Sequence, residues 1–162
     1  MTENTAKVYE VLKELEIPYT KYEHKPAYTI ADLEGLGDVS GCICKNLFVR
    51  NQKGNRHFLV IIEQTKKANL AALAEKIGST KLSFGSERRL EKYLGLKPGA
   101  VSPFGLINDE NKKVEVVVDE DLKKTENVGF HPNVNTETLI ISFSDFEKYL
   151  KWCNNKVKYI KL

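Results

Sequence analysis

The sequence has few of the residues that build disulfide frameworks or metal centres. It holds 3 cysteines, and Cys42 and Cys44 are separated by one residue rather than by the two of a metal-binding CxxC pair. Its 3 histidines, His24, His57 and His131, lack the short spacings typical of zinc ligands. We therefore expect reduced thiols and no metal.

Recognised catalytic motifs are missing as well. The sequence has no GxSxG nucleophile elbow, no known Cys/His signature, no GxxxxGK phosphate-binding loop and no GxGxxG dinucleotide motif. We therefore expect neither a conventional activated nucleophile nor a cofactor.

Long apolar runs are absent too. No stretch approaches the ~20 apolar residues that cross a bilayer, and the N-terminal residues mix Glu and Lys with apolar positions, unlike a signal peptide. The 162 residues fit one domain, and 41% hydrophobic with 29% charged residues is ordinary for a soluble protein. A net charge of +3 permits an RNA partner without demonstrating one. We expect a cytoplasmic protein with no membrane or DNA partner.

Apolar residues recur at helical spacing in several segments, most of which are bounded by capping or helix-ending residues. These segments are Val8–Leu15, ended by Pro18; Ala31–Leu36; Leu70–Ile77, closed by Gly78; Leu90–Leu94, between Ser86 and Gly95; and Phe146–Cys153, after a capping box of Ser144 and Glu147. They predict one long helix at each end of the chain and shorter helices between.

Other segments have the composition and alternation of strands. They are Tyr19–Glu23, Ile43–Arg50, Arg56–Glu63, Lys81–Phe84, Val101–Ile107, Val114–Val118, Thr138–Phe143 and the tail Lys156–Leu162. The second and third form a predicted hairpin around Asn51–Asn55, and Phe58–Ile62 is apolar on both faces, as in a covered sheet. With helices and strands interspersed, the sequence predicts one mixed α/β domain.

Lys45 is the most informative single position. If Ile43–Val49 is a strand, Lys45 shares a face with apolar neighbours, while Asn46 points the other way. An ammonium group on an apolar face needs a partner, a cavity or water, which is why such a lysine often belongs to a site. The alternative is a lysine that reaches solvent from a strand end.

Two further segments are candidates for a site. In Gly129–Asn133, His131 stands between a glycine and a proline, in a predicted loop where a rigid scaffold can present function. In Pro98–Asp109, the prolines and glycines constrain the backbone, and Gly105 allows close approach of another group. Alternatively, these segments are a surface loop and a turn before a strand.

Three stretches together resemble the YbaK/prolyl-tRNA synthetase-associated domain family over nearly the whole chain. They are Cys44–Arg50, Leu94–Asp109 and His131–Thr138, in the order and at the separations of that family. The resemblance is strongest to its freestanding alanyl-tRNA(Pro) deacylases. It implies a mixed α/β fold in which helices surround a twisted, mostly antiparallel central sheet, as a single editing domain over residues 1–162.

The resemblance also assigns functional residues. It makes Lys45 the essential lysine of the family, Asn46 the asparagine beside it and His131 a pocket histidine. The segments expected to line the same pocket contain Ser102, Phe104, Gly105, Gly129 and Asn133.

The implied activity is trans-editing, the hydrolysis of the aminoacyl ester of mischarged Ala-tRNA(Pro), which protects translation fidelity. In this family the terminal 2′-hydroxyl of the tRNA is thought to assist, so Lys45 is expected to act as a fixed positive charge rather than as a base or nucleophile. The implied partner is the acceptor end of mischarged tRNA(Pro), with prolyl-tRNA synthetase as a second candidate.

Other functions stay open at this point. The deacylase can act on serine, cysteine or another small amino acid, or the chain can be a non-catalytic module that binds an amino acid or charged tRNA. It can also be an adaptor that docks to prolyl-tRNA synthetase. The lysine pairs Lys66-Lys67 and Lys112-Lys113 are candidates for steering the acceptor stem, or are ordinary solvated surface.

Overall fold

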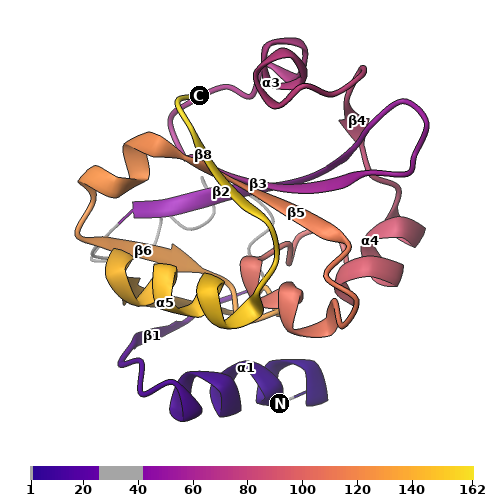
Figure 1. Cartoon of the computed structure of the whole chain (residues 1–162). Helices are drawn as coiled ribbons and strands as arrows, with labels where there is room; N and C mark the ends of the chain where they lie inside the picture. The colour runs from indigo at the N-terminus through magenta and orange to yellow at the C-terminus, as the bar shows by residue number, and fades with distance from the viewer. Residues whose placement is uncertain (1, 26–41) are drawn as a thin grey trace.

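A single mixed sheet organises the protein (Figure 1). The computed structural model describes residues 2–25 and 42–162, so the predicted helix Ala31–Leu36 lies outside the described residues. The strands of the sheet are β1 (Thr20–Glu23), β2 (Cys42–Arg50), β3 (His57–Glu63), β4 (Ser83–Phe84), β5 (Val114–Asp119), β6 (Asn127–Phe130), β7 (Glu137–Ser142) and β8 (Val157–Ile160).

The strand order is β1-β7-β6-β2-β3-β5-β8, with β4 paired to β2 at one side. Among the described strands, β1–β7, β2–β3, β2–β4 and β6–β7 are antiparallel, whereas β2–β6, β3–β5 and β5–β8 are parallel. The expected mixed α/β fold with a central sheet is therefore confirmed, with antiparallel pairs only just in the majority.

Helices cover both faces of the sheet (Figure 1). They are α1 (Glu3–Glu14), α3 (Leu70–Ile77), α4 (Glu87–Leu94) and α5 (Phe143–Cys153), joined by the 3-10 turns η1 (Pro103–Asn108) and η2 (Glu120–Lys124). Apolar residues of α1, α4, α5 and η1 pack on one face in the larger core cluster. Residues of α3 pack on the other face in a smaller cluster. Because both faces are covered, β3 is buried from His57 to Ile62, as its apolar sequence predicts.

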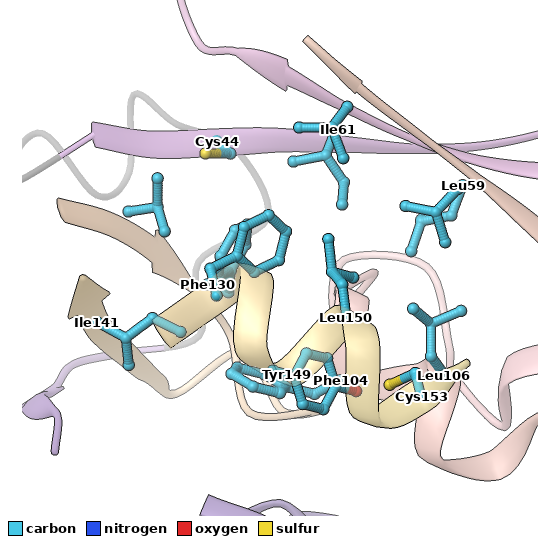
Figure 2. Close-up of a cluster of buried hydrophobic side chains, with 14 of the residues drawn as sticks. Cys44, Leu59, Ile61, Phe104, Leu106, Phe130, Ile141, Tyr149, Leu150 and Cys153 are labelled. Carbon is cyan, nitrogen blue, oxygen red and sulfur yellow. The ribbon is translucent and has the colours of Figure 1, made fainter. Parts of the chain in front are cut away.

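The larger cluster is rich in aromatic rings (Figure 2). Phe104 packs edge-on against Phe130 and Tyr149, with ring centroids 6.2 and 5.2 Å apart. The hydroxyl of Tyr149, which is fully buried, donates to the carbonyl oxygen of Pro103 at 2.8 Å. These contacts join η1, β6 and α5 into one core.

Local signals in the sequence set most helix boundaries correctly. Gly78 and Gly95 end α3 and α4 in the left-handed conformation, with φ of 69° and 64°. The hydroxyl of Ser86 accepts from the backbone of Arg89 and caps α4, as predicted. The predicted start of α5 is wrong, because Ser142 rather than Ser144 caps it, accepting from the Asp145 backbone N–H at 3.1 Å.

Two predicted strands and one predicted loop need correction. Residues 103–108 form η1 rather than the strand predicted over Val101–Ile107, because Ser102 caps the turn and Pro103 occupies its first position. Only Ser83–Phe84 of the strand predicted over Lys81–Phe84 is paired. Conversely, Gly129 lies inside β6 rather than in a loop, since β6 is held between β2 and β7.

Among the described helices, none is long and apolar enough to cross a membrane. Among residues 2–25 and 42–162, no cluster of His, Cys, Asp and Glu side chains could hold a metal ion.

Candidate active site

Lys45 lies on the face of the sheet that α3 covers. Its strand neighbours on that face, Leu47 and Val49, belong to the smaller core cluster, whereas Cys44 and Phe48 belong to the larger one. The alternation predicted from the sequence is thus present in β2. Lys45 itself is only partly buried, opposite Ile62 of β3.

The ammonium group of Lys45 is held by a backbone oxygen. Its Nζ donates to the carbonyl oxygen of Lys66 at 2.7 Å. Over residues 2–25 and 42–162 no carboxylate forms an ion pair with Lys45. Its positive charge is therefore oriented but not neutralised, and it remains able to attract an anion or a developing negative charge.

The neighbouring lysine behaves differently. Lys66 Nζ contacts the carboxylates of Asp119 at 3.0 Å and Asp121 at 2.6 Å. The hypothesis that the pair Lys66-Lys67 steers a nucleic acid therefore loses Lys66, whose charge is already neutralised. Lys67 stays exposed.

The register of β2 and β6 places Gly129 on the same face as Lys45, because Ile43 pairs with Gly129 in a parallel ladder. His131 follows directly after the end of β6, and from the alternation of that strand we infer that it lies on the same face. Val128 and Phe130 belong to the larger cluster, which leaves Gly129 and His131 on the opposite face. A Cβ at Gly129 would lie 2.6 Å from Cδ1 of Ile140 in β7, so the Ile140 side chain fills the space above Gly129 on this face.

His131 has a defined protonation pattern. Its Nδ1 lies 2.8 Å from the carbonyl oxygen of Glu137, and since a carbonyl only accepts, Nδ1 carries the hydrogen. Burial lowers the pKa of His131, and the nearby His24 lowers it further, although the hydrogen bond to Glu137 opposes this. At neutral pH the ring is therefore uncharged, with the lone pair of Nε2 available as an acceptor.

His24 is a neighbour of this site that the sequence alone did not identify. Its ring centroid lies 5.9 Å from that of His131, and its Nε2 lies 2.9 Å from the hydroxyl of the buried Thr138. The two histidines meet because β1 pairs with β7, with Tyr22 opposite Thr138. No local signal in the sequence predicts that pairing.

Asn46 points toward the larger cluster, as strand alternation requires. Its side-chain Oδ1 is buried and has no hydrogen-bond partner among the residues that the structure describes. Its Nδ2 makes a long 3.5 Å contact with the carbonyl oxygen of Cys44. Leaving a buried acceptor unpaired costs ~1–3 kcal/mol. A donor on a ligand or a water molecule would remove this cost.

The remaining predicted lining residues lie in or against η1. Ser102 Oγ accepts from the backbone N–H of Phe104 at 3.1 Å, and the Phe104 ring is in the core. Asn133, at a positive φ of 59°, donates from Nδ2 to the carbonyl oxygen of Phe104 at 3.3 Å. The structure thus joins the segment after His131 to η1, while Ser102 and Phe104 also have clear roles in folding. Their part in lining a pocket stays a prediction.

Gly105 packs so closely that we expect its replacement to destabilise the fold. A Cβ there would lie 2.6 Å from Leu96 Cδ1 and 3.1 Å from Leu94 Cβ. We expect Gly105→Ala to lower the free energy of unfolding by ~1–3 kcal/mol, the usual cost of overpacking a core. Denaturation in urea measures the change. Glu110→Ala, at an exposed position, is the control and should change it by less than ~0.5 kcal/mol. A stability equal to wild type in Gly105→Ala would contradict the close packing.

The described part of the site therefore combines two chemical elements on one face of the sheet, an oriented positive charge at Lys45 and a neutral acceptor at His131. The unpaired acceptor of Asn46 points to the other face. Lys45 and His131 together can hold an ammonium group and stabilise an oxyanion, which is what hydrolysis of an aminoacyl ester requires.

Comparisons with known proteins show the family of this chain. A model of the aminoacyl-tRNA editing domain family matches residues 24–149. The prolyl-tRNA editing protein ProX of Acetoanaerobium sticklandii is 50% identical over 93% of this chain and 93% of its own length. Prolyl-tRNA synthetase associated domain-containing protein 1 of Danio rerio is 30% identical over 88% of this chain and 78% of its own.

A solved structure shows the same fold. A protein described as a candidate trans-editing enzyme for prolyl tRNA synthetase superposes with a TM-score of 0.73, over 100% of this chain and 99% of its own, at 17% identity. The family model spans most of the sequence, including Lys45, Asn46 and His131. The chain therefore belongs to the aminoacyl-tRNA editing domain family.

Proposed function

We propose that this member of the editing family is a trans-acting deacylase that removes alanine from mischarged tRNA(Pro). In the reaction, water attacks the carbonyl carbon of the ester, the bond to the terminal ribose oxygen breaks, and free alanine and uncharged tRNA are released. The observation that carries the proposal is the oriented and unneutralised ammonium of Lys45 on the face shared with His131.

In this proposal Lys45 stabilises the negative charge that develops on the carbonyl oxygen of the ester. Negative charge develops on the carbonyl oxygen as water adds, and a fixed ammonium group stabilises it more in the transition state than in the ground state. The Lys66 carbonyl holds the ammonium in place before substrate arrives, so little reorganisation is needed. Base assistance is assigned to the terminal 2′-hydroxyl of the tRNA, as the resemblance to the editing family implies.

His131 is assigned to the amino group of the substrate. Its neutral Nε2 can accept a hydrogen bond from the α-ammonium of alanine, while its other nitrogen is fixed by Glu137. The unpaired Oδ1 of Asn46 points to the other face of the sheet, where it is available to water. The contact of His131 recognises a part common to every aminoacyl-tRNA, so the choice of amino acid must come from size.

Size selection is the reason that such an enzyme is useful. A synthetase pocket shaped for proline cannot exclude the smaller alanine, since each lost methylene contact discriminates by only ~1–3 kcal/mol. A second site that admits alanine but not the pyrrolidine ring corrects the error without harming the correct product. The names of the two relatives, one a prolyl-tRNA editing protein, support proline tRNA as the carrier.

A panel of charged tRNAs tests the proposal. We expect the purified protein to deacylate Ala-tRNA(Pro) at least about tenfold faster than Ser-, Cys- or Pro-tRNA(Pro), since one added methylene or hydroxyl in a small pocket costs roughly this much. Release of labelled amino acid over time gives the rates. Faster release of serine or cysteine would keep the deacylase but change its substrate. Binding without any release would favour the non-catalytic module or the adaptor to prolyl-tRNA synthetase.

A further inference from the structure

Lys66 occupies a position between the candidate catalytic lysine and a buried carboxylate. Its backbone oxygen accepts from Lys45 Nζ at 2.7 Å, and its own side-chain Nζ donates to Asp119 and Asp121. The same Nζ also donates to the backbone oxygen of Leu162 at 3.0 Å. One residue therefore links the proposed site to the ends of β5 and β8.

Asp119 fixes the other end of this link. Its side chain is fully buried, and besides Lys66 it accepts from the backbone N–H of Glu63 at 3.2 Å and of Asp121 at 3.1 Å. Glu63 ends β3, and its carbonyl oxygen accepts from the backbone N–H of Lys66 at 3.1 Å. The turn between β3 and α3 is thus held from both sides, and the Lys66 carbonyl within it faces Lys45.

The charges divide the two lysines into different roles. Burial alone would lower the pKa of Lys66, but its hydrogen bonds to Asp121 and Asp119 outweigh this, and its pKa is raised. Lys66 is thus a neutralised anchor, whereas Lys45, as far as the described chain shows, meets a backbone dipole and no carboxylate. An ion pair between Lys45 and a carboxylate would have held it equally well but would have cancelled the charge that catalysis needs.

We propose that Lys66, held by Asp119 and Asp121, is a positioning residue that keeps the ammonium of Lys45 aligned for the reaction through its backbone carbonyl. This inference rests on the proposed deacylase function. Lys66 does not touch the substrate in this scheme. Its loss should therefore lower kcat more than it raises KM, because the misplaced charge stabilises the transition state less well.

The test compares Lys66→Met with Asp121→Asn. Lys66→Met removes the anchor but leaves the buried Asp119 unpaired, which can prevent folding. Asp121→Asn removes only the more exposed partner and keeps Asp119 paired. We expect kcat on Ala-tRNA(Pro) to fall about tenfold or more in Lys66→Met and about threefold in Asp121→Asn, with KM within about twofold, since small misplacements of a catalytic group have effects of this size.

A second readout follows Lys45 directly and needs no activity. In protein labelled with ¹³C at lysine Cε, a held Lys45 gives two distinct Hε signals, which are assigned by their loss in Lys45→Arg. These signals should merge in Lys66→Met and move toward one another in Asp121→Asn. Lys124→Met is the matched control, because Lys124 also contacts Asp121, at 3.4 Å, but is highly exposed and does not reach Lys66. It should change neither kcat nor the Lys45 signals.

The two possible failures are distinguishable. If folded Lys66→Met or Asp121→Asn protein keeps both the wild-type kcat and the separate Lys45 signals, Lys66 is only structural and this inference is wrong. If the wild-type protein releases no amino acid from any charged tRNA, the proposed function fails instead, whatever the Lys45 signals show.

Discussion

Replacing Lys45 by alanine is expected to lower kcat for deacylation of Ala-tRNA(Pro) about 10²- to 10³-fold, the usual effect of removing one group that stabilises an oxyanion. Within the described residues the ammonium is held by the carbonyl oxygen of Lys66 and has no carboxylate partner. Rates of amino acid release at saturating substrate measure the loss. Lys45→Arg keeps the charge but is larger and differently shaped, so it should recover only part of the activity.

The controls for this experiment separate charge at the site from charge in general. Lys53→Ala removes an exposed lysine from the turn at the other end of the same hairpin, and its kcat should equal that of wild type. Circular dichroism and thermal unfolding establish that Lys45→Ala is folded. Deacylation by folded Lys45→Ala within about twofold of wild type would rule out the proposed catalytic role.

The acid limb of the pH profile is expected to report His131. The pKa of its ring is lowered from the ordinary 6.5, so the neutral acceptor persists as the pH falls below that value. It is lost only below the lowered pKa, where Nε2 gains a proton and repels the α-ammonium of the substrate. Below the lowered pKa of His131, we expect kcat/KM to fall about tenfold for each pH unit. The loss should therefore approach 100-fold about two pH units below that pKa.

His131→Gln isolates this effect, because glutamine does not titrate. Its kcat/KM should be lower than that of wild type at neutral pH and should lack the extra acid limb. The amino group of the substrate titrates in every variant, so the difference between the two profiles belongs to His131. His57→Phe is the control, and its acid limb should match that of wild type. His57 lies between Phe48 and Tyr93, and burial, together with the charges of Arg89, Arg50 and Lys92, lowers its pKa to about 4. Identical acid limbs in wild type and His131→Gln would contradict the assignment of His131.

The folded protein lowers the pKa of His57 as it does that of His131, but protonation of His57 affects stability rather than activity. Its ring is buried and accepts from Arg89 at 2.9 Å, so the folded state disfavours the charged form. Since the folded pKa lies below the unfolded one, the unfolded chain binds more protons as the pH falls from about 6.5 to 4, and stability decreases over that window. The folded fraction is therefore measured by circular dichroism at each pH of the activity profiles, so that loss of folding is not taken for protonation of His131.

The site residues show that alternation within a strand can be predicted from the sequence, whereas pairing between distant strands cannot. The position of Lys45 relative to Leu47 and Val49 follows from alternation within one strand, and the structure agrees with it. The approach of His131 depends on a parallel pairing between β2 and β6, whose strands are separated by many residues in the chain. In the same way His24 joins His131 only through the pairing of β1 with β7.

The sequence by itself determined the helices that carry their own caps, the β2–β3 hairpin, the face on which Lys45 stands and the resemblance to an editing family. All of these depend on neighbours within one turn or one strand, or on residue patterns that recur in related chains. Only the tertiary structure decided the remaining features, which are the pairing of β6, the carbonyl of Lys66 against Lys45 and the buried Asp119 that holds it. These contacts join segments distant in the chain, and their energies arise only when the whole sheet closes and excludes water from the groups involved.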